Sequence, residues 1–165
     1  MSFFPALVFH LKASSANRAE TLLIPKESQT GASIQKTEWA NTPLGVLAEW
    51  PSALTNAFNI LLNSCLPTFL CWGPHWCTLY NDALQPYLPK GDLLAHPLSE
   101  LWPAVWSALQ QELTATYTNG VAATRQDVFF QLERQVPQEE AYLSFSCSPL
   151  LEQENRIGGV LVTCI

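Results

Sequence analysis

The sequence carries little charge, and most of that charge is negative. Only 13% of the 165 residues are charged, with eight Lys or Arg against 14 Asp or Glu, and the formal net charge is −6. The basic residues are scattered, whereas binding to a phosphate backbone requires clustered Lys and Arg. This composition argues against a nucleic-acid partner.

Metal and redox motifs are also missing. The chain has five cysteines without a CxxC pair and three histidines that stand apart in the sequence. A structural zinc site needs four ligands, which usually come in closely spaced pairs. We therefore expect no metal site, and we expect the cysteines to be reduced, buried apolar residues of a cytoplasmic protein. The residues concerned are Cys65, Cys71, Cys77, Cys147, Cys164, His10, His75 and His96.

No apolar run is long enough to span a membrane, because a spanning helix needs about 20 residues. The opening FFPALVFHL is short, and Pro5 and His10 interrupt it. Residues 1–38 are polar beyond Lys12 and are interpreted as an N-terminal extension of uncertain order. Residues 39–165 are interpreted as one domain. The chain is 48% hydrophobic, with six Trp and eight Phe, which is enough apolar material for a single core.

Two helices are predicted from apolar periodicity. After Pro51, an apolar stripe recurs at helical spacing over about four turns. We expect this amphipathic helix to pack outside the sheet core and to support a homodimer, although it could equally cover its own sheet. A second helix is predicted from Pro103 to Thr118, with Asn119-Gly120 as its stop signal. The stripe of the first helix consists of Leu54, Phe58, Leu61 and Leu62.

Five strands are predicted near residues 66–72, 76–80, 124–134, 140–150 and 157–165. The runs TFLCW and WCTLY flank Gly73-Pro74, as in a β-hairpin, so Cys71 and Cys77 are expected on neighbouring strands. Asn81 and Asp82 then suit the N-cap of a helix. This order predicts an α+β fold in which helices pack on one face of a five-stranded antiparallel sheet.

Five segments carry a family resemblance that covers residues 39 to 165. They are WANTPLGVLAEWPSALTNAFNILLNS, CWGPHWCTLYNDAL, SELWPAVWSAL, ERQVPQEEAYLSFSCSPL and RIGGVLV. In sequence and order they resemble the PAS (Per-Arnt-Sim) sensory domains that open many bacterial sensor histidine kinases. Two loops depart from the family pattern: PKGDLLAHPL has Gly91 where a His is common, and EQEN lacks the usual Asp-Gly.

The resemblance implies a non-catalytic sensory or signal-relay module in a two-component phosphorelay. Such a domain passes a conformational bias to a downstream effector, and we expect the effector to lie outside this chain. It binds a small molecule or mediates dimerisation. Two alternatives stay open: an interaction module with a filled core, and a small enzyme whose sheet is covered by helices.

Motifs for catalysis and for known cofactors are missing. FSCSPL lacks the Gly-x-Ser-x-Gly elbow that carries a catalytic serine nucleophile. No set of acid, base and nucleophile residues is evident. Flavin-binding relatives share an Asn-Cys-Arg-Phe-Leu segment that this chain lacks, and Cys77 lies in HWCTLY. Haem-binding relatives place a His on the long helix. His96 precedes that helix and is interpreted as a loop residue. The cofactor is therefore unknown.

Strand alternation and helix periodicity predict a pocket between the sheet and the helices from Asp82 to Thr118. A curved sheet with helices on one face encloses a natural concavity, and small-molecule sites are usually apolar clefts. The same pattern would arise if these residues were simply core. The candidate lining residues are Phe69, Cys71, Trp102, Trp106, Leu109, Phe130, Leu143, Phe145 and Cys147.

Overall fold

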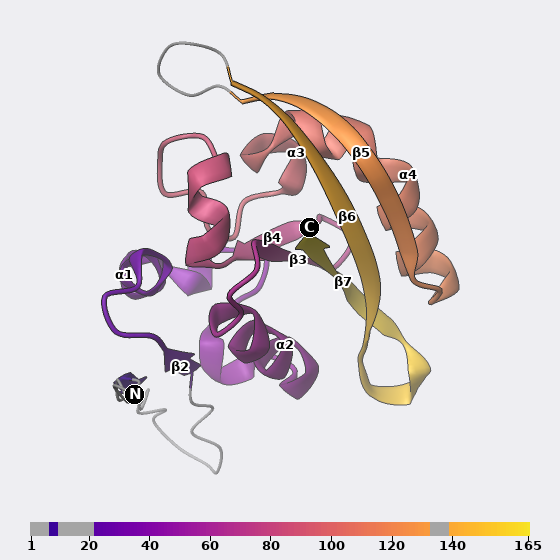
Figure 1. Ribbon diagram of the computed structural model, residues 1–165. Coiled ribbons are helices and arrows are strands. Elements are labelled where there is room, and N and C mark those ends of the chain that lie inside the picture. The colour runs from indigo at the N-terminus through magenta and orange to yellow at the C-terminus, as the bar shows by residue number, and fades with distance from the viewer. Residues whose placement is uncertain (1–6, 10–21, 133–138) are drawn as a thin grey trace, which may run out of the picture.

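A computed structural model describes residues 7–9, 22–132 and 139–165. Its main feature is a five-stranded antiparallel sheet in the order β4-β3-β7-β6-β5 (Figure 1). The predicted α+β class is confirmed, and each predicted strand agrees with a strand of the structure to within a few residues. The strands are β3 (Thr68–Trp72), β4 (Cys77–Tyr80), β5 (Ala123–Leu132), β6 (Glu139–Leu151) and β7 (Ile157–Cys164).

The hairpin of β3 and β4 is built as the sequence predicts. Gly73 begins the turn with a φ of +70°. Glycine adopts this positive φ at little cost because it has no Cβ. Cys71 lies opposite Thr78, and Cys77 lies opposite Trp72, so the two cysteines belong to neighbouring strands. The turn between β6 and β7, at EQEN, is also observed, as the short helix η4 (Gln153–Asn155).

One face of the sheet is covered by the helices that follow the first hairpin. These are η3 (Asp82–Tyr87), α3 (Leu98–Leu101) and α4 (Pro103–Asn119). Pro at the first position starts α4 without losing a hydrogen bond, and Gly120 ends it in the left-handed conformation with φ +67°. Helix α4 contacts β5, β6 and β7, so the space between it and the sheet is the interior of the domain.

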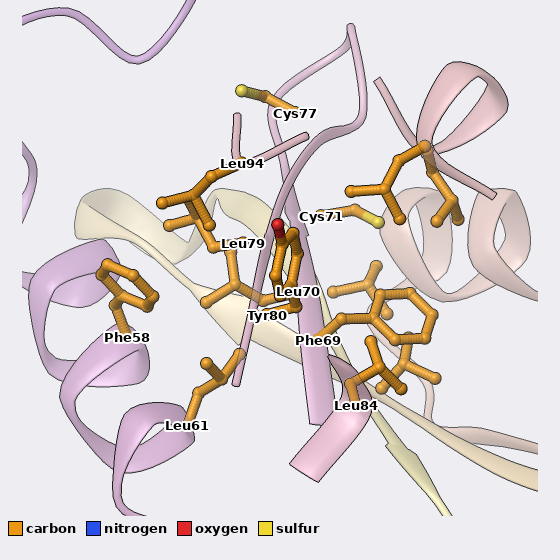
Figure 2. Close-up of a cluster of buried hydrophobic side chains, with 14 of the residues drawn as sticks. Phe58, Leu61, Phe69, Leu70, Cys71, Cys77, Leu79, Tyr80, Leu84 and Leu94 are labelled. Carbon is orange, nitrogen blue, oxygen red and sulfur yellow. The ribbon is translucent and has the colours of Figure 1, made fainter. Parts of the chain in front are cut away.

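The opposite face is covered by α2 (Ser52–Leu62), which contacts β3, β4, β6 and β7. Its predicted apolar stripe is buried within this chain, and Phe58 and Leu61 have no exposed surface. Figure 2 shows both side chains on the side of Leu79, away from Phe69 and Cys71. The stripe therefore covers the chain's own sheet, which is the alternative that the sequence left open. It does not lie outside the core.

Residues 22–38 pack onto the domain. The segment before Trp39 contains β1 (Leu7–Phe9) paired with β2 (Leu22–Ile24), followed by α1 (Gln29–Lys36). The short helices η1 (Trp39–Asn41) and η2 (Leu47–Glu49) lead on to α2. Leu22, Ile24 and Ile34 belong to the buried core. The sequence did not predict this packing, and the division of the chain into residues 1–38 and 39–165 stays a prediction.

Candidate functional site beneath the long helix

The nine predicted lining residues come from the sheet and from the chain around α4, and most of them meet in the domain interior. Cross-strand partners share a face of a sheet, and Phe69 and Cys147 both lie opposite Val162 of β7. Seven of the nine are buried, while Trp106 and Leu143 are only partly buried. The buried ones are Phe69, Cys71, Trp102, Leu109, Phe130, Phe145 and Cys147.

Four aromatic rings form a continuous row across this interior. The ring centroids of Phe69 and Trp102 are 6.4 Å apart, and those of Trp102 and Phe130 are 5.8 Å apart. Phe130 and Phe145 follow at 5.6 Å with nearly perpendicular planes. These separations are those of rings in direct contact. The row therefore fills the region between the sheet and the start of α4.

Trp106 is the predicted aromatic residue that stands apart from this row. Its ring lies 5.6 Å from that of Trp76, which in turn lies 5.5 Å from that of Tyr117. All three side chains are partly buried. Trp106 thus joins the end of the first hairpin to α4 at the border of the interior.

The thiols in this region are neutral. Burial raises the pKa of Cys71 to about 12 and that of Cys147 to about 11, with a smaller contribution to Cys147 from Glu112. Cys71 also lies 3.6 Å from the Thr78 hydroxyl. Because only the thiolate is a good nucleophile, these cysteines do not suit a covalent bond to a ligand.

Two polar side chains of α4 were not among the predicted lining residues, and each has one buried oxygen without a partner. Glu112 Oε1 accepts a 2.7 Å hydrogen bond from Arg125 of β5, but Glu112 Oε2 is buried without a hydrogen-bond partner. Thr116, one turn further, has no exposed surface, and its hydroxyl also lacks a partner. Among the described residues, these are the buried side-chain atoms that remain unsatisfied. Such unsatisfied buried groups are uncommon in folded proteins and costly in free energy.

Comparison with known proteins identifies the family to which this fold belongs. A family model described as PAS fold matches residues 77–165, which is more than half of the chain. The chain belongs to the PAS fold family. The sequence had predicted this membership, and the match confirms it.

A solved PAS domain shares the fold at low sequence identity. A PAS domain from Colwellia psychrerythraea aligns with a TM-score of 0.50 and 10% identity, over 68% of this chain and 94% of that one. A sensory box sensor histidine kinase from Vibrio cholerae aligns with a TM-score of 0.47 and 12% identity, over 68% and 90% of the two chains. No curated protein gave a significant match.

A second polar centre of this PAS domain is fully satisfied. Asn81, predicted as a helix cap, is 1% exposed and caps η3 by accepting a hydrogen bond from Leu84 N. Its Oδ1 atom also accepts from Thr68 N at the start of β3. Its Nδ2 atom donates to the carbonyl oxygens of Leu61, Ser64 and Leu66, at 3.2, 3.2 and 2.8 Å. Asn81 therefore joins the end of α2, the start of β3 and η3.

Asp82, the other half of the predicted cap, has a different partner. Its Oδ1 atom accepts a 2.7 Å hydrogen bond from Thr30 N in the first turn of α1. A carboxylate stabilises the positive end of a helix dipole, so Asp82 fastens α1 to the PAS domain. The residue is structural, as the sequence indicated, but it caps a helix 52 positions away in the chain.

The two histidines that the structure describes lie at the surface, and His10 lies outside the described residues. His75 is exposed in the hairpin turn, and His96 lies 3.5 Å from Glu100 in the loop before α3. Among the described residues, no group of three or more His, Cys, Asp or Glu side chains is placed to hold a metal ion. Nor does the described part of the chain contain a helix that is long and apolar enough to cross a membrane.

Proposed function

We propose that this PAS domain is a sensory module that binds a small ligand between the sheet and α4. It relays the bound state to an effector outside the chain, in a bacterial sensor histidine kinase or a related cytoplasmic signalling protein. Membership of the PAS fold family supports the sensory role. The five ordered segments that resemble the N-terminal domains of sensor kinases support the kinase context. The module itself is proposed to be non-catalytic.

The observation that carries the ligand proposal is the pair of unsatisfied acceptors on α4. Glu112 Oε2 and the Thr116 hydroxyl lie on the helix that also buries Leu109 and Leu113, and the Glu112 charge acts on buried Cys147 of β6. A buried carboxylate oxygen requires a hydrogen-bond donor. The ligand class that fits is a small, largely apolar molecule with one hydroxyl, amide or ammonium donor, held without a covalent bond.

Mass spectrometry of the purified chain tests this proposal. Spectra recorded under native and denaturing conditions should show a retained small molecule that denaturation releases. Glu112→Gln and Thr116→Val should each reduce the retained fraction, and Leu109→Ala should alter affinity by enlarging the space. Gln126→Ala, an exposed position on β5, is the matched control and should retain the wild-type fraction. A chain that retains nothing and binds nothing in a broad metabolite screen would contradict the proposal.

The second candidate function is a relay or interaction module with a filled core. The aromatic row from Phe69 to Phe145 favours it, because rings in direct contact leave little room for a ligand. In that case Leu109→Ala should destabilise the domain without changing any small-molecule binding. Loss of a buried Leu side chain costs about 2–5 kcal/mol.

We also propose that the domain forms a homodimer through the outer side of α2. The inner stripe is buried, but Ile60 is 67% exposed and Leu66, just beyond the helix, is 51% exposed. Sedimentation equilibrium at high micromolar concentration should show a dimer that Ile60→Asp dissociates. Gln110→Asp, at an exposed position of α4, should leave the dimer intact. A monomeric wild-type chain would remove this part of the proposal.

A further inference from the structure

A separate cleft lies outside the sheet–α4 interior, where the N-terminal segment meets the domain. It has a volume of about 260 Å³. Its floor is formed by Leu22 and Ile24 of β2, Ile34 of α1 and Trp39 of η1, and these side chains are between 3% and 8% exposed. Leu47 of η2, together with Gln35 and Thr37, completes the lining. The lining residues therefore come from four elements that precede the part matched by the family model.

The lining of this cleft is largely apolar, and two of its polar groups are already hydrogen-bonded within the chain. The Trp39 indole N–H donates to Ile34 O at 3.0 Å, so the ring offers the cleft an apolar face. The Thr37 hydroxyl likewise donates to Ser33 O at 2.8 Å. No charged residue is among those that line the cleft. A charged ligand would lose its hydration here without gaining a partner, which is costly.

The size of the cleft restricts its occupant further. A cavity of about 150 Å³ lined by aliphatic and aromatic side chains is known to take up benzene. A volume of about 260 Å³ is then suited to a fused pair of rings, and it is too small for a helix or strand of a partner protein. The exposed Gln35 amide at the edge can hydrogen-bond to one polar group.

We propose that this cleft is a second ligand site, which binds a small neutral apolar molecule with at most one polar group. The site does not depend on the ligand proposed for the interior. The occupant would touch Trp39, whose ring is 5.0 Å from that of Trp50, and Trp50 packs against Phe58 of α2 at 5.9 Å. A molecule bound in the cleft would thus contact the elements that connect the N-terminal segment to the sheet.

Two naphthalene derivatives of matched size test the proposal, with the six Trp indole N–H signals of the full chain observed by NMR. Neutral 2-naphthol should shift the Trp39 indole signal saturably, and anionic 2-naphthoate should bind at least about tenfold more weakly. Equal affinity for the two probes would overturn the proposal, as would an unmoved Trp39 signal. Shifts confined to Trp102 and Trp106 would also overturn it, and they would favour the interior site instead.

Two blocking variants and their neighbours complete the test. Leu47→Trp should fill the cleft and reduce 2-naphthol affinity at least about tenfold, whereas Val46→Trp, exposed and outside the lining, should not. Gln35→Trp repeats the block from an exposed position of α1, with exposed Lys36→Trp as its control. These helix positions are at the surface, so the second pair remains informative if Leu47→Trp fails to fold. Equal binding by blocked and control variants would refute the assignment.

Discussion

The two buried polar centres of this domain differ in how completely they are satisfied. The Asn81 amide makes five hydrogen bonds, to three carbonyl oxygens and two backbone N–H groups. Glu112 Oε2 and the Thr116 hydroxyl are also buried atoms, yet neither has a hydrogen-bond partner.

This difference separates a structural residue from a functional candidate. A fully satisfied buried group fixes the relative position of the elements that it joins. A half-satisfied group weakens the fold, because the desolvation of its free atom is not offset by a hydrogen bond. The Asn81 centre therefore stabilises the junction of α2, β3 and η3, and the α4 centre is where we propose that a ligand supplies the missing hydrogen bond.

The largest effect is expected at Asn81. Asn81→Ala removes the side-chain partner of the Ser64 carbonyl and of the Thr68 N–H, whereas Leu61 O and Leu66 O still accept from Ser64 N and Thr68 Oγ1. Each uncompensated buried group costs about 1–3 kcal/mol, so we expect a loss of about 3 kcal/mol in the free energy of unfolding, measured by urea denaturation. Asn56→Ala, on the exposed side of α2, is the control and should change stability by less than about 0.5 kcal/mol.

Thr116→Val should act in the opposite direction. It replaces an unsatisfied hydroxyl with a methyl group of similar size, so we expect thermal unfolding to show a gain of about 1 kcal/mol. The matched control is Thr78→Val. Thr78 is equally buried, but its hydroxyl donates to Trp76 O at 2.9 Å, and its loss should cost about 1 kcal/mol. Equal destabilisation by both variants would mean that the two hydroxyls are equally satisfied.

Asp82→Ala should have a local effect. It removes the 2.7 Å hydrogen bond to Thr30 N and the favourable charge at the start of α1, which together are worth about 1 kcal/mol. Hydrogen exchange should become faster in residues 22–37 and stay unchanged in β6 and β7. Asp82→Asn retains an acceptor and is expected to restore most of the protection.

Arg125→Ala should have the smallest effect. The Arg125 side chain is 52% exposed, and ion pairs of this kind contribute about 0–1 kcal/mol. Urea denaturation should therefore show a loss of about 0.5 kcal/mol. A loss of several kcal/mol would show that Arg125 compensates the buried Glu112 carboxylate, and that the α4 centre is as tightly integrated as Asn81.

The fold was predictable because strong local signals agree with one another. Gly73-Pro74 between two aromatic runs specified the hairpin, and the Pro103 start with the Asn119-Gly120 stop specified α4. Burial of the strand and helix residues nominated for the pocket followed from simple periodicity. The same periodicity could not show whether those residues line a space or fill it, because both arrangements bury apolar side chains.

Features that depend on long-range partners were not predictable from local patterns. Nothing near Asp82 indicates Thr30 as its partner, and the packing of β2 and α1 on the domain is not evident from their polar sequence context. Glu112 and Thr116 gave a weak signal, since both interrupt an apolar stripe that includes Leu109 and Leu113. Whether their oxygens find partners depends on β5 and β6, which the helix sequence alone does not specify.

The unequal exposure of the five cysteines makes the native chain a ready template for site-directed spectroscopy. Cys65 is exposed, whereas the other four are buried and have pKa values raised to about 11 or 12 by desolvation. A thiol-reactive spin label or fluorophore applied to the folded protein would therefore mark Cys65 alone. That residue lies between α2 and β3, beside the junction that Asn81 holds together. Movements of α2 relative to the sheet could be recorded there without introducing a single mutation.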